Sequence, residues 1–142
     1  EIEKLIRSTG FFHNKARNIQ GFARRLRADH GAVIPRTLEE LVKLPGIGRK
    51  TANVVLQELY RIPSGVVVDT HVARLSRVLG LTTHTAPVKV ERDLMEALLV
   101  PAWIDFSLYL IFLGRSHCTA RIRVCPGCPL LDECPSADRA RH

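Results

Sequence analysis

The sequence is poor in aromatic residues, and it has no cysteine before position 118. With 6% aromatic and 46% hydrophobic residues, a folded core must consist mainly of Leu, Val, Ile and Ala. No apolar run is long enough to cross a bilayer, and the first residues lack the pattern of a secretory signal peptide. We therefore expect no membrane partner, and the 142 residues fit one compact domain.

Positive charge is in excess along the chain. Lys and Arg number 21 against 14 Asp and Glu, which gives a formal net charge of +7. A basic surface attracts polyanions, and nucleic acid is the usual polyanion because its binding releases counterions. At this point, a basic protein with no nucleic-acid role remains the alternative.

Apolar residues recur at helical spacing over most of the chain, which predicts an all-α fold. The short run Val66–Val68 is expected to be a buried extended segment before a helix rather than a strand of a sheet. After Cys118 the periodicity is lost, so we expect a helical domain over 1–116 and a ligand loop with a tail over 117–142. Helices are expected at about 1–9, 14–30, 37–44, 49–60, 70–79, 87–99 and 104–115.

The segment between two of these helices carries two glycines separated by one residue. Glycine accepts a positive φ and allows another backbone to approach closely. The turn leads into a helix N-terminus, whose unpaired amides favour an anion such as a DNA phosphate. This pattern is typical of a helix-hairpin-helix, although an ordinary glycine-rich connection is the alternative. The candidate DNA-binding residues are Leu44, Gly46, Ile47, Gly48, Arg49 and Thr51.

Lys50 and Asp69 are the candidate catalytic residues. Lys50 falls in the first turn after the hairpin, where the helix dipole opposes its charge and favours the neutral amine that Schiff-base chemistry needs. Asp69 follows the extended segment and would stabilise positive charge on a sugar or activate the amine. The alternatives are a solvated surface lysine and a carboxylate that caps the next helix.

All four cysteines lie in one short stretch with the spacing C-x6-C-x2-C-x5-C, namely Cys118, Cys125, Cys128 and Cys134. A disulfide framework would be spread through the chain, so the clustering indicates a metal or cluster site in a reducing compartment. Structural zinc sites usually present two close cysteine pairs, whereas only one is present here. A [4Fe–4S] cluster is therefore favoured over zinc, and zinc over disulfides.

Three segments occur together in the order found in one family. They are residues 44–56 (LPGIGRKTANVVL), residues 68–74 (VDTHVAR) and the cysteine loop, and residues 10–16 (GFFHNKA) add a weaker fourth. The chain resembles the endonuclease III family of the helix-hairpin-helix glycosylase superfamily, and the resemblance covers essentially its whole length.

The resemblance implies a base-excision repair enzyme, a DNA glycosylase with AP-lyase activity. Its partner would be double-stranded DNA with oxidised pyrimidines or abasic sites, with the damaged base flipped into a pocket. The family's catalytic lysine and aspartate match Lys50 and Asp69, and its cluster ligands match the four cysteines. The related adenine-glycosylase branch lacks a lysine at the position of Lys50. A bacterial member would work in the cytoplasm, associated with the nucleoid.

The chain departs from the family in one respect. Family members have several helices before the segment that matches Glu1, and those helices supply parts of the base pocket. A monomer is expected if the native product includes them. The alternative to an active enzyme is therefore an inactive or incomplete DNA-binding module of the same fold, and a third hypothesis is a zinc-stabilised structural protein.

Overall fold

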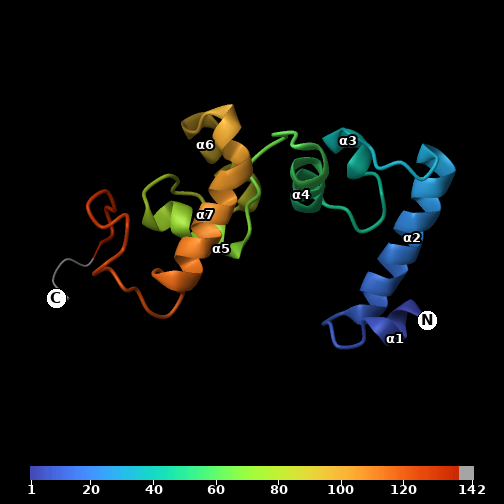
Figure 1. The fold of residues 1–142 in the computed structure, drawn as a ribbon, viewed down its shortest axis with the longest axis horizontal. Helices are drawn as coiled ribbons and strands as arrows, with labels where there is room; N and C mark the ends of the chain where they lie inside the picture. The colour runs from blue at the N-terminus through green and yellow to red at the C-terminus, as the bar shows by residue number, and fades with distance from the viewer. Residues whose placement is uncertain (138–142) are drawn as a thin grey trace. The chain divides into compact units, whose positions relative to one another are not determined.

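The computed structural model describes residues 1–137, and the five residues after them, which belong to the expected C-terminal tail, lie outside the described part. Helices and loops make up the described chain, with a single isolated β-bridge between Cys118 and Arg123, so the all-α prediction is confirmed. The chain divides into two compact units (Figure 1), the N-terminal unit Glu1–Tyr60 and the C-terminal unit from Arg61 onward. No helix among the described residues is long and apolar enough to span a membrane.

The N-terminal unit contains four helices, α1 (Ile2–Leu5), α2 (Phe12–His30), α3 (Leu38–Leu41) and α4 (Arg49–Tyr60). The long helix α2 ends where Gly31 takes the left-handed conformation, with φ of 57°. Thr37 caps α3, since its hydroxyl accepts the Glu40 amide and also donates to the Glu40 carboxylate. The buried apolar side chains of this unit are Ala16, Leu41, Leu44, Ala52 and Leu56.

The C-terminal unit contains α5 (Thr70–Val78), α6 (Pro87–Ala97), a short 3₁₀ turn (Val100–Ala102) and α7 (Trp103–Ser116). The segment before α5 is extended and buried as expected, and Ser107 of α7 donates a 2.7 Å hydrogen bond to the Val67 carbonyl. Because a buried carbonyl needs a partner, this bond fixes the approach to α5. The core of the unit consists of Val66, Val68, Val72, Leu75, Val90, Leu94, Leu110 and Leu113.

Helices α5 and α7 approach closely at Gly114. A Cβ atom at this position would lie 2.7 Å from His71 Nδ1 and 3.1 Å from Leu75 Cδ1, so a larger residue would require these side chains or the helices that carry them to move. Glycine lowers helix stability relative to alanine. At this position, however, the missing side chain allows α7 to pack closely against α5.

The cysteine loop packs against this core. The side chains of Cys118, Cys128 and Leu130 pack against the hydrophobic core of the C-terminal unit. The loop therefore belongs to the same unit as α5, α6 and α7. The boundary expected from sequence after residue 116 therefore differs from the division in the structure, because loss of helical periodicity marks the end of a helix and not the end of a packed unit.

Candidate active site and cluster loop

The hairpin turn joins α3 to α4 in the N-terminal unit. Leu44 is buried, with 3% of its surface exposed, and the Ile47 amide donates to the Leu44 carbonyl at 3.1 Å. Gly46 has φ of +77°, and a Cβ at that position would lie 2.7 Å from Asn18 Cβ on α2. Gly46 therefore serves the fold itself, because both its backbone conformation and its contact with α2 exclude a side chain.

Gly48 differs from Gly46. It does not have a positive φ, and a Cβ at its position would meet no heavy atom of the described chain within 4 Å. The first intrahelical bond of α4 runs from the Ala52 amide to the Gly48 carbonyl, so the amides of Lys50 and Thr51 precede the helical ladder. This exposed helix N-terminus is the part of the hairpin that is open to a phosphate.

Lys50 lies in the first turn of α4, and its side chain is exposed. Among the described residues of the N-terminal unit, no carboxylate pairs with its amine. A lysine held in a salt bridge would have to break it before acting as a nucleophile, and Lys50 has no such cost within its unit.

Asp69 is the N-cap of α5, and its Oδ1 accepts the Val72 amide at 2.8 Å. The capping interpretation from sequence is therefore confirmed. Only one carboxylate oxygen forms this bond, and the residue is half-buried at the start of α5. The cap therefore uses only Oδ1 and leaves the second oxygen, Oδ2, outside this bond.

Lys50 belongs to the N-terminal unit and Asp69 to the C-terminal unit. Each is described within its own unit, and their joint action on one substrate stays a prediction.

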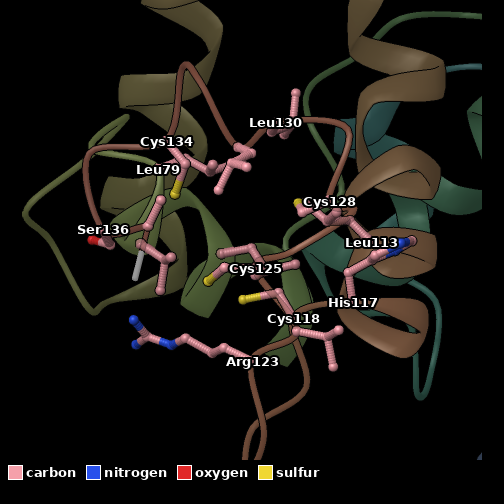
Figure 2. A pocket seen from close by; sticks show the side chains of 15 residues that line it. Leu79, Leu113, His117, Cys118, Arg123, Cys125, Cys128, Leu130, Cys134 and Ser136 are labelled. Atoms are coloured by element: carbon pink, nitrogen blue, oxygen red, sulfur yellow. The ribbon is translucent and has the colours of Figure 1, made fainter. Parts of the chain in front are cut away.

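The four cysteines carry free thiols, each partly buried, and all of them line one cavity between α5, the end of α7 and the loop. Figure 2 shows their sulfur atoms arranged around this cavity, with Leu79, Leu113 and Leu130 among its apolar walls. Free thiols on a shared apolar cavity exclude the disulfide alternative for the described conformation and fit a bound inorganic group.

A single zinc ion and an iron–sulfur cluster place different demands on this cavity. Zinc needs four ligands about 2.3 Å from one point. Within residues 1–137, no three His, Cys, Asp or Glu side chains come together closely enough to hold one ion. Four thiols that line one shared cavity are consistent with a bound [4Fe–4S] cluster.

Arg74 is a residue of the cysteine site that sequence reasoning missed. Its guanidinium donates to the Cys118 carbonyl at 2.5 Å and contacts Cys118 Sγ at 3.8 Å. Arg74 stands 44 residues before Cys118, and no spacing rule connects the two positions. The only available signal was its place in the VDTHVAR segment, one and a half helical turns after Asp69.

Comparison with known proteins identifies the relatives of this chain. A helix-hairpin-helix motif matches residues 29–58. Endonuclease III of Synechocystis sp. is 53% identical over 137 residues, which is 96% of this chain. The chain is a homologue of endonuclease III. The chain spans 63% of the length of that relative, and the homology applies to this stretch of the relative only.

Solved structures agree with the endonuclease III relationship. A non-covalent endonuclease III–DNA complex and a trapped endonuclease III–DNA covalent intermediate each match with a TM-score of 0.87 and 43% identity. Each match covers 95% of this chain and 63% of the other. The fold predicted from sequence, a helix-hairpin-helix glycosylase-like helical domain followed by a cysteine loop, is confirmed.

Proposed function

We propose that this chain is the part of a base-excision repair DNA glycosylase that carries both its nucleophile and its cluster, with AP-lyase activity on oxidised pyrimidines and abasic sites. The observation that carries the proposal is the exposed Lys50 in the first turn after the hairpin, in a homologue of a protein that has been trapped covalently on DNA.

Lys50 is the proposed nucleophile. Its neutral amine attacks C1′ of the deoxyribose, a C1′–N bond to lysine forms, and the glycosidic bond breaks as the base leaves with the electron pair and takes up a proton. The lysine nitrogen then loses a proton, and its lone pair forms the C1′=N double bond of the Schiff base as the C1′–O4′ bond breaks and the ring oxygen takes up a proton. Removal of a C2′ proton then expels the 3′ phosphate, which nicks the strand, and water releases the lysine by hydrolysis of the imine.

Asp69 is the proposed acidic partner of this reaction. Its carboxylate would stabilise the positive charge that develops on the sugar as the glycosidic bond breaks, or accept the proton that Lys50 loses. The bond from the Val72 amide holds Oδ1 in place, which orients Oδ2 without any motion of the backbone.

The hairpin is the proposed binding site for the DNA backbone. Amides at the N-terminus of α4 would bind a phosphate without reading sequence, and the open side of Gly48 leaves room for it. Leu44, Ile47, Arg49 and Thr51 complete the candidate contact set around Gly46 and Gly48. Binding of this kind suits an enzyme that must search duplex DNA for rare lesions.

Cys118, Cys125, Cys128 and Cys134 would hold a [4Fe–4S] cluster. When bound, the cluster would join the loop into one rigid element against α5 and α7. Metal analysis of the purified protein tests this assignment. Equal amounts of iron and acid-labile sulfide are expected, and a colourless protein with zinc and no iron would overturn it.

Strand nicking tests the catalytic proposal. Duplex DNA with one abasic site and a 5′ label should give a β-elimination product with the wild-type protein, none with Lys50→Ala and much less with Asp69→Asn. Salt-sensitive binding of the duplex without any nicking would instead identify the chain as a DNA-binding module that lacks activity.

A further inference from the structure

Helix α2 carries two arginines on one face, with a glycine between them. Arg17, Gly21 and Arg24 follow the spacing i, i+4, i+7, which places them on the same side of an α-helix. Arg17 and Arg24 are both exposed. With a rise of 1.5 Å per residue, their Cα atoms stand roughly 10 Å apart along the helix.

This face of α2 is the one against which the hairpin packs. A Cβ at Gly21 would lie 3.1 Å from Pro45 Cβ, and the Cβ position of Gly46 lies 2.7 Å from Asn18 Cβ. Asn18 and Gly21 are three residues apart and share a face. Along the axis of α2, one arginine therefore precedes and the other follows the point where the turn meets the helix. The helix and the turn both belong to the N-terminal unit.

The two arginines are also unpaired, in contrast to their neighbour. Arg25 forms a 2.6 Å ion pair with Asp29 one turn later. Among the described residues, neither Arg17 nor Arg24 has an ion-pair or hydrogen-bond partner. Because side chains on a helix lean toward its N-terminus, Arg24 leans back toward Gly21 and the turn. Two unpaired arginines thus lie on the face of α2 that meets the hairpin turn.

We propose that Arg17 and Arg24 bind phosphates of the same DNA duplex as the hairpin, and so extend the DNA-binding surface of the hairpin along the backbone. The inference rests on the proposed function and names further binding residues for it. Phosphates along one strand are spaced about 3.4 Å along the helix axis, so roughly 10 Å between the arginines spans about three of them. Such contacts hold the protein on DNA and carry no sequence preference.

The salt dependence of duplex binding tests this proposal. Each phosphate contact contributes about 0.9 to the slope of log K against log salt, so Arg17→Gln and Arg24→Gln should each lower the slope by about that amount. Each should also weaken binding roughly ten-fold at about 0.1 M salt, with undamaged and abasic duplexes affected equally.

Arg7→Gln is the matched control. Arg7 is an exposed arginine of the same unit and carries the same charge. It lies outside α2, before Gly10, and so it is not on the helix face that meets the hairpin. Its loss should leave the slope unchanged. Equal effects of all three substitutions would overturn the proposal, because they would reflect net charge alone.

A second pair of variants separates charge from fold. Arg17→Lys and Arg24→Lys keep the positive charge, so they should keep most of the wild-type slope. A slope lost in these variants as well would contradict a phosphate contact. If wild-type protein shows neither salt-sensitive binding nor nicking, the proposed function fails. If wild type binds and nicks but the Arg17 and Arg24 variants match it, only this inference fails.

Discussion

Arg74 joins the helix that Asp69 caps to the first cysteine of the loop. It donates to the Cys118 carbonyl at 2.5 Å and contacts the Cys118 sulfur at 3.8 Å, while Asp69 holds the start of the same helix through the Val72 amide. The candidate catalytic carboxylate and the candidate cluster site are therefore both tied to one short helix, the carboxylate at its N-terminus and the cysteine loop at its middle.

Arg74→Met should weaken the cluster site. It removes a charge-assisted hydrogen bond to the carbonyl and the donor beside the sulfur, contacts of the kind that orient metal ligands. We expect the visible absorption of the bound cluster to decay several times faster in air, measured at constant temperature. Arg77→Met is the control, since Arg77 is exposed on the same helix. Equal decay in both variants would contradict the role of Arg74.

Asp69→Asn and Asp69→Ala should separate the two roles of this residue. Asparagine caps helices about as well as aspartate, so Asp69→Asn should change the free energy of unfolding little but lower the glycosylase rate by roughly 10²-fold or more. Asp69→Ala should lose the rate and also about 1 kcal/mol of stability in urea. If Asp69→Asn were as unstable as Asp69→Ala while losing little activity, the carboxylate would be a cap alone.

The two hairpin glycines should respond differently to substitution. Gly46→Ala should destabilise the protein by roughly 1–2 kcal/mol from the left-handed backbone alone, with a further cost from the contact with Asn18. Gly48→Ala should cost less than about 1 kcal/mol, because open space surrounds its Cβ position. Thermal unfolding measures both. Gly48→Val should nevertheless weaken binding to all duplexes alike, and a loss confined to lesion-containing DNA would contradict the phosphate site.

The helices and the turn were predictable because local sequence encodes them. Apolar periodicity located α2, α4, α5 and α7, and the glycines located the hairpin. The first helix was the least accurate prediction. It was expected over residues 1–9 but ends at Leu5, because Thr9 turns back to the Ile6 carbonyl with both its amide and its hydroxyl.

The tertiary contacts of the site were not predictable from local sequence. The different roles of Gly46 and Gly48 depend on which one faces Asn18, a contact across 28 positions of the chain. The contact between Arg74 and Cys118 likewise depends on how α5 packs against α7. Such contacts arise from packing and have no periodic signature.

Asp93 should make the stability of the C-terminal unit depend on pH in acid. The Thr82 hydroxyl donates to its carboxylate at 2.5 Å and His84 Nδ1 donates at 2.7 Å, and these bonds lower the pKa of Asp93. A lowered folded-state pKa gives stability that is present above about pH 4 and is lost as the pH falls through the folded value. Urea midpoints measured from pH 6 to pH 2 should fall less steeply in Asp93→Asn and Thr82→Val. An unchanged slope would contradict the assignment.

Borohydride trapping on abasic-site DNA tests the central claim most directly, because it reduces the Schiff base to a stable covalent bond. Wild-type protein incubated with the duplex and sodium borohydride should give a covalent protein–DNA adduct, and Lys50→Ala should give none. Lys89→Ala, which removes an exposed lysine of α6 outside the proposed site, should retain the adduct. The absence of an adduct with wild-type protein, or an adduct that survives Lys50→Ala, would contradict the assignment of Lys50 as the nucleophile.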